Sequence, residues 1–344
     1  MIDALLASAV GVGVATATAT AITYRHLFVR CNRPDYALTP GEYCYSRVKD
    51  RLSREKFFYN IKGKKLCGYY YPTEKCWGIA IFCHGMRSGA DDYIPLIEQL
   101  VLSGVSVFAY DCTGTYESPG KNTVGMGQQV VDLKFTVDYL TSRTELRRLP
   151  IFLIGHSWGA YASAAVLSLV NCVSGCVAIA GMNNGTDIMV AKAKEMIGPL
   201  AFISRPVFLA CQKLAFGDYV DLTAVDGINS SGASTLIAHG IGDRVVRFNE
   251  QSIIAKRKKI TNPSVKYYIG KGLRSGHSDI MYSEEAIAYR MEIQSEILLR
   301  EMKTGRRLSA NDKAELYRSI DHRLYSRPNR ELVELIISTF REGL

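Results

Sequence analysis

Short apolar runs alternate with helical segments along most of the chain, and this alternation restricts the fold more than any other feature of the sequence. The apolar runs have the length and composition of strands buried on both faces, at residues 78–85, 105–111, 150–156, 175–181, 234–240 and 265–270. Sequence of helical character stands between them, at residues 91–104, 127–143, 158–170 and 247–258. Strands that alternate with helices form a parallel sheet with helices on both faces. The sequence therefore predicts an α/β fold.

Three further segments add to this alternating core. Two alternating runs flank Gly63 within residues 56–72, which predicts a hairpin that adds antiparallel strands at one edge of the sheet. Residues 182–230 carry apolar helical sequence without a clear strand. An insertion at this point would lie over the strand ends, where ligands bind in open α/β sheets, so we expect it to form a helical cap. Near the C-terminus, one helical face gathers apolar residues and is expected to pack on the same domain: Leu332, Leu335, Ile336 and Phe340.

The length of 344 residues suits one large α/β domain with additions, and 47% hydrophobic residues provide for a sizeable core. We expect an N-terminal apolar helix over residues 1–30 and a connector over residues 31–54. The α/β domain is expected over residues 55–302, with the cap at about residues 182–230, and a helical extension over residues 303–344.

The N-terminal helix is a candidate membrane anchor. Residues 4–23 carry no charge and are about as long as a helix that spans a bilayer. Arg25, Arg30 and Arg33 follow this stretch, and positive residues tend to stay on the cytoplasmic side. We therefore expect a membrane-anchored protein whose catalytic domain faces the cytoplasm. A soluble cytoplasmic protein with a surface-lying helix stays open, and so does a cleaved signal peptide, because the stretch contains Ala-x-Ala strings.

The cysteine and charge patterns indicate which metals, membranes and macromolecules the chain could bind. Nine scattered cysteines without a Cys-x-x-Cys pair indicate reduced thiols and neither a disulfide framework nor a zinc site. The net charge of +9 includes basic clusters at residues 255–259 and 303–307, which suit either solvated helix faces or an anionic membrane surface. Aromatic and basic residues do not interleave, so nucleic-acid binding is not expected. The sequence favours no particular oligomeric state.

The stretch Gly155-His156-Ser157-Trp158-Gly159 follows a predicted strand and precedes an Ala-rich helical segment. A strand that turns sharply into a helix at a serine lifts the hydroxyl group above the sheet edge, and the small neighbours Gly155 and Gly159 allow the close packing. The backbone N–H groups that follow lie at a helix N-terminus, where negative charge is stabilised. Ser157 is therefore a candidate nucleophile, and a plain strand–helix turn is the alternative.

A serine needs a base to take its proton, and the base needs an orienting acid. His277 is the best placed of six histidines, because it lies in a polar loop after the last strand. Asp243 lies just beyond the end of the strand at 234–240. Asp279 competes with it, but a residue two positions along a loop rarely points back at the ring. We predict that Ser157, Asp243 and His277 form a catalytic triad.

Five motifs together give the chain a resemblance to the α/β-hydrolase fold family over about residues 55–300. They are HGM at 84–86, DCTGTYESPG at 111–120, GHSWG at 155–159, GDRVV at 242–246 and GHSD at 276–279. The resemblance is strongest to the branch of monoglyceride lipases, lysophospholipases and serine aminopeptidases. One departure is that DCTGTYES lacks an arginine that this branch often carries after the fourth strand.

The resemblance implies a mostly parallel sheet with an N-terminal antiparallel hairpin, helices on both faces and a helical cap. It implies that Ser157 is the nucleophile, His277 the general base and Asp243 its orienting acid. The backbone N–H groups of Met86 and Trp158 would form the oxyanion hole. No cofactor and no metal is implied.

We therefore expect a serine hydrolase that cleaves carboxylic esters, of lipid-like or acylglycerol type, through an acyl-enzyme intermediate. A serine aminopeptidase is an alternative, which would need an acidic group in the cap to hold the substrate amine, and Glu195 and Asp187 are the candidates. A thioesterase and a non-catalytic, membrane-tethered interaction module also stay open.

Overall fold

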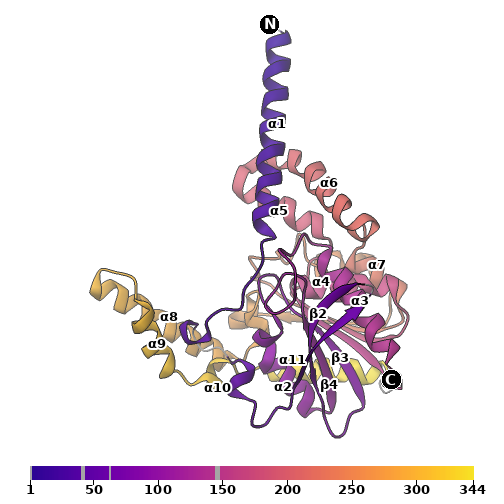
Figure 1. Cartoon of the computed structure of the whole chain (residues 1–344), viewed down its shortest axis with the longest axis vertical. Helices are drawn as coiled ribbons and strands as arrows, with labels where there is room; N and C mark the ends of the chain where they lie inside the picture. The colour runs from indigo at the N-terminus through magenta and orange to yellow at the C-terminus, as the bar shows by residue number, and fades with distance from the viewer. Residues whose placement is uncertain (1, 40–42, 62, 144–147) are drawn as a thin grey trace.

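An eight-stranded sheet forms the centre of the protein (Figure 1). The structure is a computed structural model that describes residues 2–39, 43–61, 63–143 and 148–344. The strand order is β1-β2-β4-β3-β5-β6-β7-β8. The strands are β1 Glu55–Ile61, β2 Lys64–Tyr71, β3 Gly78–Cys83, β4 Val105–Asp111, β5 Ile151–His156, β6 Val173–Ile179, β7 Ser234–Gly240 and β8 Val265–Gly270. Strand β2 pairs antiparallel with both β1 and β4, and the other pairs are parallel, which confirms the predicted sheet and its hairpin edge.

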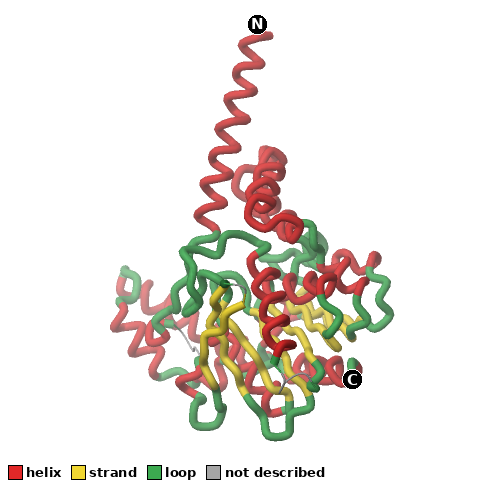
Figure 2. The backbone as a smooth tube through the Cα atoms, turned by 45° about the vertical axis from the view of Figure 1, so that its right-hand side comes forward, coloured by secondary structure: helices red, strands yellow, loops and turns green. Residues whose placement is uncertain are grey.

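Helices cover both faces of the sheet (Figure 2). Side chains of a strand alternate between the two cores, so Ile79 and Ile81 of β3 enter one and Ala80 and Phe82 enter the other. The first core is closed by α3 Gln128–Ser142, α4 Trp158–Ala165 and α7 Ala224–Ser230. The second is closed by α2 Ile94–Leu102 and α11 Arg330–Glu342. The fold is thus the predicted α/β fold with helices on both faces.

The C-terminal helix α11 belongs to this layered body. Leu332, Ile336 and Phe340 of α11 are buried in the second core, and the Phe340 ring stacks on Phe152 with a centroid distance of 4.4 Å. The prediction that this apolar helical face packs on the same domain is confirmed. Between β8 and α11, α8 Glu284–Thr304, α9 Ala310–Arg318 and α10 His322–Tyr325 form an arm at one side (Figure 1).

Residues 182–230 are helical, as expected. They form α5 Gly185–Ile197, α6 Ser204–Phe216 and α7, of which α7 packs against α4. The domain boundaries themselves stay a prediction. Short 3-10 helices complete the structure at Tyr36–Leu38, Tyr45–Arg47, Ala90–Tyr93, Val166–Leu169, Gly198–Ile203, Gly217–Val220, Ile254–Lys259, Gly272–Ser275 and Asp279–Met281.

The helix predicted over residues 247–258 is wrong. The segment forms turns and the single 3-10 helix Ile254–Lys259. The hydroxyl group of Ser252 donates to the carbonyl oxygen of Phe248 and accepts from the backbone N–H of Ala255. A side chain that bonds its own backbone in this way competes with regular helical hydrogen bonds.

The N-terminal helix α1, Ile2–Leu27, projects from the body at its start and packs beside α6 at its end (Figure 1). Glycine and threonine dilute its apolar sequence at Gly11, Gly13 and Thr20. Within the part of the chain that the structure describes, no helix is both long and apolar enough to cross a membrane. The predicted membrane-spanning anchor over residues 4–23 is therefore not supported, although the side chains of residues 2–10 lie outside the described part.

Candidate active site

Ser157 lies at the sharp turn between β5 and α4. Its backbone angles are φ 56° and ψ −115°, in the left-handed region that non-glycine residues rarely adopt. A Cβ atom on Gly155 would lie 2.3 Å from the backbone of Gly159, and one on Gly159 would lie 2.0 Å from the carbonyl oxygen of Cys83. Both flanking glycines are therefore required by close backbone packing. The geometry is that of a turn that presents a serine hydroxyl group above the sheet.

The structure brings the three predicted catalytic residues together. Nε2 of His277 lies 2.9 Å from Oγ of Ser157, and Nδ1 of His277 lies 2.7 Å from Oδ2 of Asp243. Both distances are those of hydrogen bonds. The serine hydroxyl group can thus donate to Nε2 while Nδ1–H donates to the carboxylate. Asp243, and not Asp279, occupies the Nδ1 side of the ring.

Asp243 is buried and held by three donors and a neighbouring histidine. The backbone N–H groups of Val245 and Val246 donate to Oδ1, and His277 donates to Oδ2. Nε2 of His239 lies 3.1 Å from the same Oδ2 and 2.8 Å from the carbonyl oxygen of Val246, so its N–H is shared between the two acceptors. Burial opposes ionisation of this carboxyl group, but the hydrogen bonds from the two histidines outweigh it and lower its pKa. Asp243 is therefore an ionised acceptor for His277. His239 was not among the predicted site residues, although its position at the end of a strand, four residues before Asp243, was a signal in the sequence.

His156, next to the serine, packs beside His277. The two ring centroids are 4.9 Å apart, and Nε2 of His156 lies 3.2 Å from the carbonyl oxygen of His277. On its other side, Nδ1 lies 2.9 Å from the hydroxyl group of Tyr93, which accepts from the backbone N–H of Gly85. The hydroxyl group therefore donates to Nδ1, which leaves Nε2–H to donate to His277. Burial, followed by the charge of His277, lowers the pKa of His156 to about 3, so this ring is neutral.

Met86 and Trp158, the predicted oxyanion-hole residues, line the same cavity as Ser157. Trp158 is the first residue of α4, so its backbone N–H needs no partner within the helix. Gly85 lies so close to the serine that a Cβ atom on it would be 3.5 Å from Cβ of Ser157. The loop after β3 and the start of α4 thus meet at the serine.

The cavity at Ser157 has a volume of about 140 Å³ and is almost entirely apolar. Its walls come from the end of α1, the loops before α3 and after β6, helix α5 and the loop after β7. Lys192 of α5 is the charged side chain among its lining residues. Such a cavity is suited to a small apolar group next to the serine hydroxyl group.

The acidic residues considered for binding a substrate amine lie elsewhere. Asp187 and Glu195 line a different, charged cavity. Asp187 is paired with Arg205 at 2.6 Å, and Glu195 accepts from Lys192 and from Arg247, each at 3.0 Å. The hydrogen bond from Lys192 lowers the pKa of Glu195. Both carboxylates are thus already neutralised by basic side chains.

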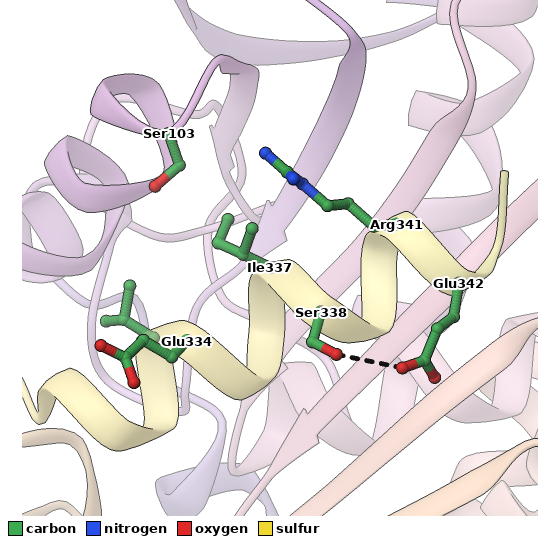
Figure 3. A pocket seen from close by; sticks show the side chains of 7 residues that line it. Ser103, Glu334, Ile337, Ser338, Arg341 and Glu342 are labelled. Carbon is green, nitrogen blue, oxygen red and sulfur yellow. Dashed lines mark hydrogen bonds between the residues drawn. The ribbon is translucent and has the colours of Figure 1, made fainter.

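A second groove runs along α11, at the opposite end of the strands from Ser157 (Figure 3). Its lining includes Ser103, which shortly precedes β4, so the groove lies near the amino ends of the strands. Ser157, in contrast, follows the carboxyl end of β5. Ser338 in the groove bonds Glu342 at 3.0 Å within the same helix. None of the predicted catalytic residues lines this groove.

The chain is similar to known hydrolases in sequence and in fold. Residues 75–209 match the family model of the serine aminopeptidases, S33. A stretch of 116 residues is 29% identical to protein phosphatase methylesterase 1 of Candida albicans and covers 33% of this chain. The match spans 31% of that methylesterase, less than a third of its length.

Similar solved structures include esterases. The esterase Pf2001 of Pyrococcus furiosus has a TM-score of 0.53 at 22% identity and covers 73% of this chain and 90% of its own. Est1E of Butyrivibrio proteoclasticus, solved with ferulic acid, has a TM-score of 0.50 at 16% identity and covers 72% of this chain and 99% of its own. Sheet topology and structural likeness agree that the chain has the α/β-hydrolase fold, and residues 75–209 are similar to the serine aminopeptidase model.

Proposed function

We propose that this protein is a serine hydrolase that cleaves carboxylic esters through an acyl-enzyme intermediate. The single observation that carries the proposal is the ring of His277, which bridges Ser157 at 2.9 Å and Asp243 at 2.7 Å. A serine becomes a nucleophile at neutral pH when a base so placed takes its proton. The strained turn at Ser157, which presents the hydroxyl group to the cavity, supports the same role.

In this proposal, Oγ of Ser157 attacks the ester carbonyl carbon while its proton moves to Nε2 of His277. Asp243 stabilises the imidazolium that forms, and the backbone N–H groups of Met86 and Trp158 stabilise the oxyanion. The imidazolium then gives its proton to the departing alkoxide, and the acyl group stays on Oγ. Water, activated by His277, releases the acid and restores the hydroxyl group.

One observation favours an ester over a peptide with a free N-terminus. Asp187 and Glu195, which could have held the ammonium group of such a peptide, are paired with the basic side chains of Arg205 and Lys192. The names of the methylesterase relative and of the esterase structures also support ester hydrolysis. An apolar acyl group, as in lipid-like or acylglycerol-type esters, is supported by the apolar cavity walls.

The test is covalent labelling with a fluorophosphonate followed by peptide mapping, together with hydrolysis of p-nitrophenyl esters. We expect labelling at Ser157, and we expect Ser157→Ala to lose both labelling and hydrolysis. Ser168→Ala, an exposed serine shortly after α4, is the matched control and should retain both. Matched thioester and aminoacyl p-nitroanilide substrates separate the alternatives, because faster turnover of either would contradict the ester proposal.

A further inference from the structure

The cavity at Ser157 is closed on one side by the end of the N-terminal helix. Leu27 and Phe28 line it, although they precede the expected start of the α/β domain at residue 55 by a long stretch of chain. Phe28 is only 2% exposed and packs into the same core cluster as Trp158. The N-terminal segment is therefore part of the wall around the reacting serine.

This wall is fixed to the body by backbone contacts. The carbonyl oxygen of Phe28 accepts from the N–H of Thr123, and Val29 pairs with Asn122 as an antiparallel bridge. The guanidinium group of Arg30 donates to three backbone carbonyl oxygens of the loop after β4, at 2.6 to 3.0 Å. Further back, Tyr24 packs against the Phe28 ring with a centroid distance of 4.9 Å. The position of Phe28 is thus set from both sides.

The other walls differ in stiffness. Trp158 is held by a 2.8 Å hydrogen bond from Nε1 to the carbonyl oxygen of Met126. Much of the remaining lining is methionine, a flexible side chain that adapts to the shape of a ligand: Met86, Met126, Met182 and Met189. The aromatic rings of Phe28 and Trp158 are therefore the stiffer parts of the wall, while the methionine side chains can adjust to a bound group.

The volume indicates what fits. An apolar cavity of about 150 Å³ in another protein binds benzene, so the 140 Å³ at Ser157 suits a group of about six carbon atoms. During hydrolysis the acyl group stays bonded to Oγ of Ser157 while the alcohol has to leave. A cavity next to Ser157 whose walls are largely buried side chains therefore suits the acyl side of the substrate better than the leaving group.

We infer, on the basis of the proposed ester hydrolysis, that Phe28 limits the acyl group to a compact apolar one, a short chain or a single aromatic ring. Longer acyl chains would meet the Phe28 ring. Because one methylene group in a hydrophobic pocket changes selectivity by about tenfold or more, this wall would produce a sharp cut-off in chain length.

The experiment measures kcat/KM for p-nitrophenyl esters from acetate to decanoate with the full-length protein and with Phe28→Ala. We expect the wild-type optimum near butanoate to hexanoate, and at least about a tenfold lower kcat/KM for decanoate. Phe28→Ala should move the optimum to octanoate or longer and raise the decanoate value about tenfold. Val14→Ala, exposed on the same helix, is the control and should keep the wild-type profile.

Phe28→Leu keeps part of the side-chain volume and should give a chain-length profile between those of the wild type and Phe28→Ala. It replaces Phe28→Ala in the experiment if that variant does not fold. A folded Phe28 variant with the wild-type chain-length profile would overturn the inference, as would a wild-type preference for decanoate. These outcomes are distinguishable from failure of the proposed ester hydrolysis. In that case the wild-type protein would hydrolyse none of the esters, and Ser157 would not be labelled by the fluorophosphonate.

Discussion

Nε2 of His156 lies 3.2 Å from the backbone carbonyl oxygen of His277, so the residue before the candidate nucleophile supports the candidate base. The same imidazole is held at Nδ1 by Tyr93, whose hydroxyl group accepts from Gly85 in the loop after β3. One neutral ring therefore connects the loop that carries Met86 to the loop that carries His277. We assign His156 a positioning role, since it contacts neither of the two hydrogen-bonding nitrogens of the His277 ring.

The first prediction tests this positioning role. His156→Phe keeps an aromatic ring but removes both hydrogen bonds, and a small displacement of a catalytic group can cost about a hundredfold in rate. We expect kcat for a p-nitrophenyl ester to fall roughly 10- to 100-fold while KM changes little. His156→Gln, which can still donate to His277, should recover much of the loss. A residue with only a packing role would instead give Phe and Gln variants of equal activity.

The second prediction concerns the acid that serves His277. Asp243→Asn should lower kcat by about a thousandfold or more, because the amide cannot hold the imidazole tautomer or stabilise the imidazolium. Asp279→Asn should cost about tenfold or less through loop geometry. Both variants are measured on one soluble ester, with melting curves to show that they are folded. If Asp279→Asn were the more damaged enzyme, the assignment of Asp243 would be wrong.

The sheet and the central site could be predicted from the sequence because their signals are local. Buried strands have a distinct apolar composition, and the carboxyl ends of parallel strands meet at one edge. Residues that follow β5 and β7 therefore had to approach each other, as Ser157 and Asp243 do. His277 could be placed because it follows the last strand.

Features that depend on long-range packing could not be predicted. Phe28 reaches the cavity because the N-terminal segment docks on the body, through the bond from Thr123 and through the packing of α1 beside α6, where Oγ1 of Thr20 lies 3.3 Å from Oγ of Ser204. An uncharged, 20-residue stretch gave no sign of this contact and suggested a membrane span instead. The helix expected at 247–258 failed for a local reason, the hydrogen bonds of Ser252 to its own backbone.

A third prediction follows from the pKa of His156, which burial and the charge of His277 lower from 6.5 to about 3. Between these values the unfolded chain binds a proton that the folded protein does not, so the free energy of unfolding rises with pH. As pH falls from about 6.5, this one group should reduce that free energy by about 1.4 kcal/mol per pH unit.

Urea denaturation of the wild type and of His156→Gln, at several values between about pH 7 and pH 4.5, isolates the contribution of this ring. Other buried groups, such as His84 with its lowered pKa, contribute equally to both proteins and cancel in the difference. The wild type should lose stability faster than the variant on acidification. A difference that stays constant with pH would show that His156 titrates normally in the folded protein.

The last prediction concerns how the N-terminal segment is held against the site. Arg30 bonds the carbonyl oxygens of Tyr116, Ser118 and Gly120, and this fixes the chain directly after Phe28. Arg30→Ala leaves those acceptors without their charged donor, which we expect to cost about 1–3 kcal/mol in the free energy of unfolding. A loosened segment should also let the Phe28 ring retreat, so kcat/KM for long-chain esters should rise relative to short-chain esters.

Arg25→Ala is the control, because it removes the same charge from an exposed position of α1; it should change neither the free energy of unfolding nor the chain-length profile. Equal melting curves and equal chain-length profiles for the two arginine variants would mean that Arg30 does not hold the wall, and that the backbone bridge of Val29 with Asn122 does so alone.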